Sequence, residues 1–189
     1  LSWDDFAQAT ACYYANCSMI DEQIGRLLAV LDRLNMSQNT IIVFTSDHGD
    51  YMGEHRLLLK GIPAFEVAYR ILLILSGPGI PQGRQVTAIV SLLDLVPTVV
   101  ALTAGNTFAC QGRSLLPLLG NEAVEWRSEA YAECHGQRFN YTQRVLWQDD
   151  HKYVFNGFAE DERGCGDNAG DRLDLFGDLF ELGKAVNHF

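Results

Sequence analysis

The sequence contains little positive charge. Its 14 Lys and Arg residues are outnumbered by 24 Asp and Glu residues, which gives a formal net charge of −10 over 189 residues. Nucleic-acid binding depends on clustered Lys and Arg side chains that neutralise phosphates, so this composition argues against a nucleic-acid partner. No basic amphipathic face is present either, and a membrane surface is therefore not an expected partner.

Long apolar runs and paired cysteines are also missing. The apolar runs fall well short of the roughly 18 residues that a membrane-spanning helix needs. The five cysteines form neither a C-x-x-C pair nor a Cys/His zinc pattern, so we expect buried or free thiols. Hydrophobic residues still make up 48% of the chain and charged residues 20%, a globular composition. Nothing in the sequence predicts an oligomeric state.

The first 45 residues have the pattern of an α/β protein. Ser2 and Asp5 are spaced as a capping box, which marks the start of a helix. Apolar residues then recur at steps of three, four or seven, at Phe6, Tyr13, Cys17, Ile20, Ile24, Leu27, Leu31 and Leu34. This stripe predicts a helix over residues 3–34 that packs on a sheet. The apolar run at residues 40–45 predicts a strand buried on both faces.

The rest of the chain divides into two patterns. In chain order, the expected elements are a helical turn at 66–70, strands at 71–75 and 85–89, a helix at 98–103 after a capping box at 91–94, a strand at 129–134, a hairpin of strands 143–147 and 152–156, a solvated loop at 161–171 and a final strand at 178–182. The character changes from mixed to β after about residue 126. We therefore expect two parts, residues 1–125 and 126–189.

The end of the predicted strand at 40–45 carries groups suited to chemistry. Asp47, His48 and Gly49 follow it directly, and an Asp–His pair is compatible with Ca²⁺, Mg²⁺, Mn²⁺ or Zn²⁺. Lys60, twelve residues after His48, offers one point charge for an anion. Three further charged or imidazole groups crowd the same loop, namely Asp50, Glu54 and His55. The alternative is a simple turn in which Asp47 caps its own backbone.

The order of these motifs resembles the C-terminal half of a sulfatase. The motifs are Asp47-His48-Gly49-Asp50, Gly53-Glu54-His55, Lys60-Gly61, and Arg70 with a strand leading to Gly77-Pro78-Gly79. More broadly, the chain is similar to the alkaline-phosphatase superfamily, which includes the phosphonate monoester hydrolases. The resemblance extends over nearly the whole chain. It implies an alkaline-phosphatase-like mixed sheet flanked by helices in residues 1–125, then a small antiparallel β subdomain in residues 126–189.

The resemblance also implies roles for individual residues. Asp47 and His48 would be two ligands of a divalent cation, with Ca²⁺ favoured by the family and Mg²⁺, Mn²⁺ and Zn²⁺ still compatible. Lys60 would bind the sulfate oxygens and the leaving-group oxygen. His55 would line the leaving-group side, with a solvent-facing loop histidine as the alternative. The implied substrate is a small sulfate ester or a sulfated sugar.

The nucleophile of the family has no counterpart in this sequence. In sulfatases it is a formylglycine hydrate made from the first residue of a Cys/Ser-x-Pro-Ser/Thr-Arg motif, and that motif is absent. The context of Cys110 comes nearest, but it lacks the proline and its arginine is misplaced. The family's early Asp-Asp metal ligands are absent as well. We therefore expect the C-terminal portion of a sulfuric ester hydrolase, inactive by itself. The alternatives are a phosphonate or phosphate ester hydrolase and a non-catalytic sulfatase-like fragment.

Overall fold

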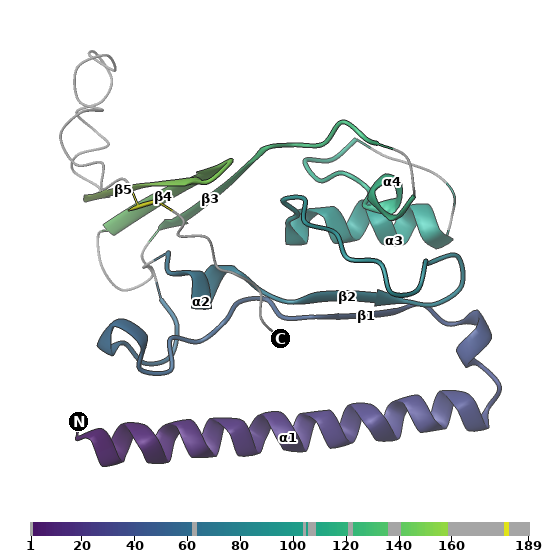
Figure 1. The fold of residues 1–189 in the computed structure, drawn as a ribbon, viewed down its shortest axis with the longest axis horizontal. Coiled ribbons are helices and arrows are strands. Elements are labelled where there is room, and N and C mark those ends of the chain that lie inside the picture. Colours follow the sequence, from purple (N-terminus) through teal and green to yellow (C-terminus); the bar gives the residue numbers. More distant parts are fainter. Residues whose placement is uncertain are drawn as a thin grey trace. The chain divides into compact units, whose positions relative to one another are not determined.

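The computed structural model of the chain describes residues 2–61, 64–103, 105, 109–120, 123–135, 141–158 and 180–181. The chain forms two compact units (Figure 1). The helix–strand unit comprises Leu1–Gly61 and Phe65–Arg84, and the sheet unit comprises Ile62–Ala64 and Gln85–Phe189. Within the described residues, none of the helices has the length and apolar character needed to cross a bilayer.

The helix–strand unit begins with α1 (Trp3–Arg33), and its expected capping box is present. The Ser2 hydroxyl accepts from the Asp5 backbone N–H, and the Asp5 carboxylate accepts from the Ser2 backbone N–H. None of its residues is buried, although Phe6, Ile24 and Leu31 of the apolar stripe are half-buried. Packing of this helix on a sheet stays a prediction. A helix of 31 residues is about 46 Å long, and the unit's sheet is only two strands wide, about 5 Å between strand axes.

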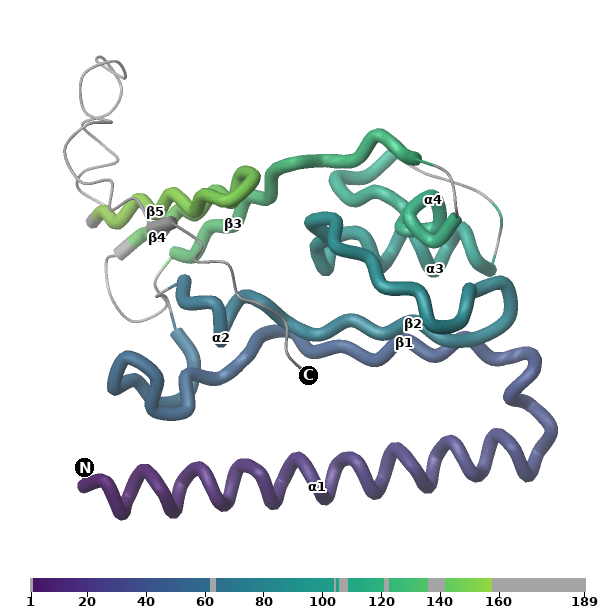
Figure 2. Tube along the Cα trace, viewed as in Figure 1, coloured from purple at the N-terminus to yellow at the C-terminus, as the bar shows by residue number. Residues whose placement is uncertain are grey.

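That sheet consists of β1 (Ile42–Thr45) and β2 (Leu73–Ser76), which pair antiparallel with Ile42 opposite Ser76. The prediction of burial on both faces is also wrong, since Phe44 is 39% exposed and Ile74 is 57% exposed. No further described strand pairs with this sheet. Figure 2 traces the path from α1 through η1 into β1. The remaining short elements of the unit are η1 (Ser37–Asn39), η2 (Glu54–Arg56) and α2 (Glu66–Tyr69), the last as expected.

The sheet unit opens with irregular backbone followed by short helices. The strand expected at residues 85–89 is not formed. Instead, the Ile89 carbonyl accepts from the indole N–H of Trp126. The donor to this backbone carbonyl is therefore a side chain and not the N–H of a neighbouring strand. The helices are η3 (Leu92–Asp94), α3 (Leu95–Thr103) and α4 (Leu116–Leu119). The capping box predicted at residues 91–94 is present.

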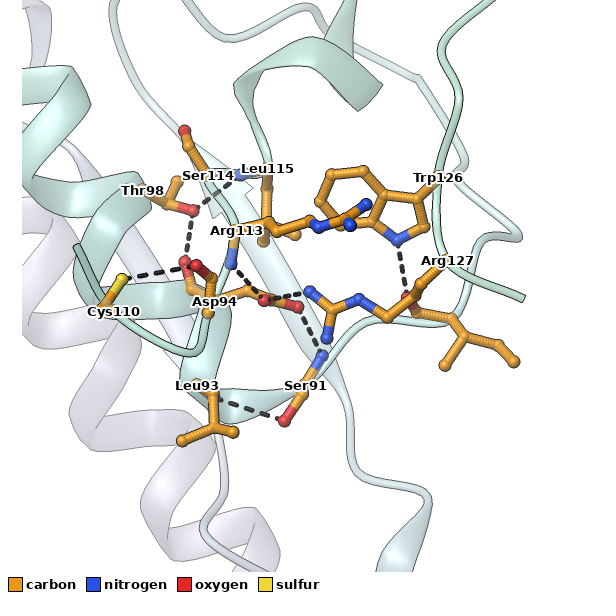
Figure 3. A network of polar contacts seen from close by, with 12 residues as sticks. Ser91, Leu93, Asp94, Thr98, Cys110, Arg113, Ser114, Leu115, Trp126 and Arg127 are labelled. Carbon is orange, nitrogen blue, oxygen red and sulfur yellow. Dashed lines mark hydrogen bonds and ion pairs between the residues drawn. The ribbon is translucent and has the colours of Figure 1, made fainter. Parts of the chain in front are cut away.

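A buried carboxylate organises this unit (Figure 3). Asp94 is 0% exposed and accepts hydrogen bonds from the backbone N–H groups of Ser91 and Arg113, each at 2.8 Å. The Arg127 guanidinium donates to the same carboxylate and forms a salt bridge with it. Asp94 therefore joins three segments that lie up to 33 residues apart in the chain.

Thr98 and Trp126 extend the same network. The Thr98 hydroxyl donates to the Asp94 carbonyl and accepts from the Leu115 backbone N–H at 2.8 Å. The Arg127 guanidinium lies 5.2 Å from the centre of the Trp126 ring. This guanidinium thus contacts a carboxylate and an aromatic ring together, an arrangement that suits a delocalised cation.

The chain ends in an antiparallel sheet of four strands in the order β3-β4-β5-β6. These strands are β3 (Glu129–His135), β4 (Tyr141–Gln148), β5 (His151–Phe158) and β6 (Phe180–Glu181). The expected strand at 129–134 and the expected hairpin are confirmed. The expected solvated loop at residues 161–171 lies outside the described residues. The division of the chain at residue 125 stays a prediction.

Candidate metal and oxyanion site

The backbone that follows β1 is held in a fixed turn. The Ser46 hydroxyl donates to the His48 carbonyl at 2.7 Å, and the Gly49 N–H donates to the Ala68 carbonyl of α2 at 2.9 Å. A Cβ atom on Gly49 would lie 1.7 Å from the Val67 carbonyl oxygen. Only glycine fits this close approach, so Gly49 fixes the direction in which the preceding side chains leave the strand.

Asp47 and His48 place two candidate ligand atoms close together. Asp47 Oδ2 lies 3.5 Å from His48 Nε2, and the side chains are 82% and 43% exposed. His48 Nδ1 lies 2.8 Å from the Gly49 carbonyl. Because a carbonyl only accepts, Nδ1 carries the proton of the neutral ring, and Nε2 keeps the lone pair that a metal needs.

The separation of Asp47 Oδ2 and His48 Nε2 can be compared with the separations expected from the metal–ligand bond lengths of different cations. Two ligand atoms at right angles around one ion are about 3.4 Å apart at Ca²⁺ bond lengths and about 2.9 Å apart at Mg²⁺ bond lengths. The observed 3.5 Å fits the larger ion without rearrangement. Tetrahedral Zn²⁺, with bonds of about 2.0–2.1 Å, gives a similar separation of about 3.4 Å. The pair therefore fits a cation, and geometry alone leaves two classes of ion.

The turn interpretation of Asp47 and the ligand interpretation are compatible. Asp47 Oδ1 accepts from the His48 backbone N–H at 2.9 Å, which is local capping. This hydrogen bond lowers the pKa of the Asp47 carboxyl below its ordinary value, so the group stays ionised. Capping uses Oδ1, while Oδ2 faces His48 Nε2. An ionised carboxylate with one oxygen directed to the imidazole is the form that binds cations.

Two ligands do not complete a metal centre. Among the residues that the structure describes, no group of three His, Cys, Asp or Glu side chains is arranged to hold an ion. Structural and catalytic cation sites use at least three protein or water ligands. The roles of Asp47 and His48 as metal ligands therefore stay predictions.

The loop between residues 50 and 60 folds back on itself. The Tyr51 N–H donates to the Leu59 carbonyl and the Gly53 N–H to the Leu57 carbonyl, both at 2.7 Å. Lys60 is exposed and follows the residue that pairs with Tyr51, so its backbone returns to the start of the loop. Its ammonium has no ion-pair partner among the described side chains. That Lys60 shares an oxyanion with the Asp47–His48 pair stays a prediction.

This loop adopts an unusual backbone conformation, which aromatic packing supports. Positive φ angles occur at Met52 (45°), Gly53 (94°), His55 (51°), Arg56 (61°) and Leu59 (64°). Each such residue other than glycine costs about 1–2 kcal/mol. The Tyr51 side chain is 3% exposed and meets the Phe65 ring edge-on at 6.1 Å. The His55 imidazole stacks against the same Phe65 ring, with centroids 3.7 Å apart.

The stacking of His55 on Phe65 bears on its two interpretations, a residue that lines the leaving-group side and a solvent-facing loop histidine. Its side chain is 50% exposed, so it is neither buried nor a freely solvated loop residue. A role in contacting substrate stays a prediction. Sequence reasoning did not identify Tyr51 and Phe65 as supports of the loop. No sequence signal distinguishes them from ordinary core aromatics, because their contacts depend on the folded loop.

Comparison with known proteins gives the family of the chain. A family model described as Sulfatase matches residues 2–105, more than half of the sequence. This chain belongs to the sulfatase family. Its similarity to Arylsulfatase K is 33% identity over 156 residues for the zebrafish (Danio rerio) protein and 34% over 183 residues for the Xenopus laevis protein. These matches cover 80% and 91% of this chain but only 30% and 32% of the relatives, so the chain spans about a third of their length.

Solved structures agree with the fold. A 2-O GAG sulfatase superposes with a TM-score of 0.75 at 24% identity, over 89% of this chain and 40% of that one. The phosphonate monoester hydrolase from Silicibacter pomeroyi superposes with a TM-score of 0.64 at 28% identity, over 86% of this chain and 32% of that one. The predicted alkaline-phosphatase-like fold with a small β region at its C-terminal end is thus confirmed.

Proposed function

We propose that this chain is the C-terminal portion of a metal-dependent sulfatase that hydrolyses sulfate monoesters. In this proposal, Asp47 and His48 supply two ligands of a divalent cation, and Lys60 binds oxygens of the sulfate group. The substrate class is a small sulfate ester or a sulfated sugar. Family membership supports hydrolysis of sulfuric esters, and the assignment of residues rests on the geometry at the end of β1.

One observation carries the residue assignment. The 3.5 Å separation of Asp47 Oδ2 and His48 Nε2, together with the Nδ1 contact to the Gly49 carbonyl, leaves two lone pairs directed to one region. A bound divalent cation supplies fixed positive charge opposite the negative charge that develops on the ester oxygens. The capped carboxylate of Asp47 and the oriented imidazole of His48 are the groups in this chain that would hold it.

Lys60 supplies the second positive charge. The sulfate group carries negative charge in the ground state, and more charge develops on the departing oxygen during cleavage. An ammonium held at the end of a closed loop stabilises that charge without reorganising in the reaction. The hydrogen bond between Tyr51 and Leu59 supports this role, because it fixes the backbone immediately before Lys60.

The chain lacks the sulfatase nucleophile motif, so we expect no turnover by the 189-residue protein alone. The direct test of the site is therefore cation binding. We expect Ca²⁺ titration calorimetry to give an affinity that Asp47→Ala weakens by about tenfold or more, because the substitution removes a charged ligand. Asp21→Ala is the matched control, since Asp21 is an exposed carboxylate on α1.

Two results would contradict the proposal. Equal Ca²⁺ affinities for Asp47→Ala and the unmodified protein would remove Asp47 from the site. Hydrolysis of an aryl sulfate by the purified chain at enzyme-like rates would show that it already holds a nucleophile. Competition by Mg²⁺, Mn²⁺ and Zn²⁺ in the same titration identifies the preferred ion.

A phosphonate or phosphate ester hydrolase is a second candidate. The similarity to the Silicibacter pomeroyi phosphonate monoester hydrolase favours it, and the Asp47, His48 and Lys60 arrangement suits either oxyanion. Comparative kinetics on sulfate and phosphonate monoesters, with a protein that includes the nucleophile portion, separates the two. Absence of turnover on both substrates would favour a non-catalytic sulfatase-like fragment.

A further inference from the structure

Lys152 is a buried lysine in a strand of the sheet unit. It is the second residue of β5 and is 7% exposed, although lysine is almost never fully buried without a partner. It pairs with Trp147 across the β4–β5 hairpin and shares one face of that hairpin with Val145 and Val154. Burying a charge among apolar side chains costs free energy that hydrogen bonds must offset. This position therefore requires an acceptor for the ammonium.

One acceptor is a backbone carbonyl that is distant in the sequence. Lys152 Nζ donates to the Ala64 carbonyl oxygen at 2.8 Å, across 88 residues of chain. Ala64 is itself 6% exposed, so this hydrogen bond is shielded from water. A charged donor makes a stronger hydrogen bond than a neutral one, and a buried carbonyl that loses its donor destabilises the fold. Lys152 thus holds the backbone at Ala64.

Ala64 directly precedes Phe65, the residue on which the loop that ends at Lys60 packs. The Tyr51 ring meets the Phe65 ring edge-on, and the His55 imidazole stacks on it. Lys60 lies four residues before Ala64 in the chain. Ala64 belongs to the sheet unit and Phe65 to the helix–strand unit. A hydrogen bond that holds Ala64 therefore acts on the loop through the peptide bond that joins these two residues.

The same segment also supports the turn that carries Asp47 and His48. Phe65 precedes α2, and its carbonyl accepts from the Ala68 N–H at 3.0 Å. The Ala68 carbonyl in turn accepts from the Gly49 N–H at 2.9 Å. Isolated helices shorter than about 12 residues are marginal in water, and α2 has only four residues. The position of α2 therefore depends on what holds the residues at its start.

We propose that Lys152 is a positioning residue for the candidate metal and oxyanion site. Its hydrogen bond to the Ala64 carbonyl holds Phe65 and the start of α2 in place. The loop before Lys60 packs on this segment, and the turn after His48 is hydrogen-bonded to it. The inference rests on the proposed function, which assigns a cation and a sulfate group to that loop and turn. Lys152 acts through the backbone and is assigned no contact with the sulfate group.

Amide hydrogen exchange in the 189-residue protein tests this proposal. Lys152→Met removes the ammonium and keeps an unbranched apolar side chain. The Tyr51 and Gly53 N–H groups close the loop before Lys60. We expect their exchange to become about tenfold faster or more in Lys152→Met, because a hydrogen bond from a charged donor is lost. Lys152→Arg keeps a charged donor of different shape and should limit the increase to about threefold.

Val154→Ala is the matched control. Val154 lies on the same strand and the same face as Lys152, so this substitution weakens the sheet while the ammonium stays in place. We expect it to accelerate exchange in β4 and β5 but to change exchange at Tyr51 and Gly53 by less than about twofold. If Lys152 stabilises only its own sheet, Lys152→Met should show this same pattern.

Sulfate binding provides a second measurement. The sequence has three lysines, so mass spectrometry of trace acetylation assigns the reactivity of Lys60 directly. Inorganic sulfate in a buffer with Ca²⁺ should protect the Lys60 amine of the unmodified protein. Half protection should require about fivefold more sulfate or more in Lys152→Met, because the closed loop is populated for a smaller fraction of the time. Val154→Ala should require the same concentration as the unmodified protein.

The outcomes separate this inference from the proposed function. Loop exchange in Lys152→Met that equals that of the unmodified protein or of Val154→Ala would overturn the inference. If Lys152→Met does not fold, Lys152→Arg decides the question, since its loop exchange must still exceed that of Val154→Ala. Absence of sulfate protection at Lys60 in the unmodified protein would refute the proposed role of Lys60, and the exchange measurement would still decide the role of Lys152.

Discussion

Removal of the Asp94 carboxylate should destabilise the sheet unit more than any other single truncation discussed for this chain. Asp94→Ala leaves the Arg127 guanidinium, whose side chain is only 17% exposed, without its counter-ion. It also leaves the backbone N–H groups of Ser91 and Arg113 without an acceptor. Breaking a buried ion pair from one side costs about 3–5 kcal/mol, and each unsatisfied N–H costs about 1–3 kcal/mol.

These costs are not additive, because the three donors share one acceptor group. We therefore expect a loss of about 4–6 kcal/mol, comparable with the whole stability of a domain of this size. Asp94→Asn should cost somewhat less, about 3–5 kcal/mol, because it too removes the negative charge that pairs with Arg127. The amide keeps one oxygen for Arg113 and Arg127, but its NH₂ group cannot accept from the Ser91 N–H.

Urea unfolding measures the effect. Tryptophan fluorescence follows the transition, since Trp126 packs against Arg127 and its indole N–H binds the Ile89 carbonyl. Combining Asp94→Ala with Arg127→Ala should cost at least about 2 kcal/mol less than the sum of the single changes, because the stranded charge is also removed. An additive double variant, or Asp94→Ala within about 1 kcal/mol of the unmodified protein, would refute the assignment of Asp94 as the centre of this network.

Other sites give further predictions. Gly49→Ala should cost more than about 1 kcal/mol in urea unfolding and should also weaken Ca²⁺ binding, because its Cβ would overlap the Val67 carbonyl. Gly25→Ala, in the open middle of α1, should instead stabilise the protein by about 0.5–1 kcal/mol in the same assay. The pKa of Tyr131 is raised, first by desolvation and then by its hydrogen bond to Glu133, whose own pKa that bond lowers. The bond therefore persists between these two pKa values, and Glu133→Gln should lower the pKa of Tyr131 in an NMR titration. An unchanged titration would exclude the bond.

Features encoded by neighbouring residues were predictable from the sequence. The helix α1 follows from a capping box and a long apolar stripe that agree with each other. The β4–β5 hairpin follows from two strand-forming runs around a polar turn. The Asp47–His48 pair is adjacent in the chain, so the turn at the end of β1 needs only to bring two neighbouring side chains together.

Features that depend on distant residues were not predictable. The partners of Asp94 lie 19 and 33 residues further along the chain, and no local pattern identifies them. The closed loop before Lys60 depends on left-handed backbone at non-glycine residues, which propensity argues against. Burial of β1 on both faces was inferred from apolar content alone. Apolar content indicates that a strand can be buried, but burial also requires a neighbour that covers it.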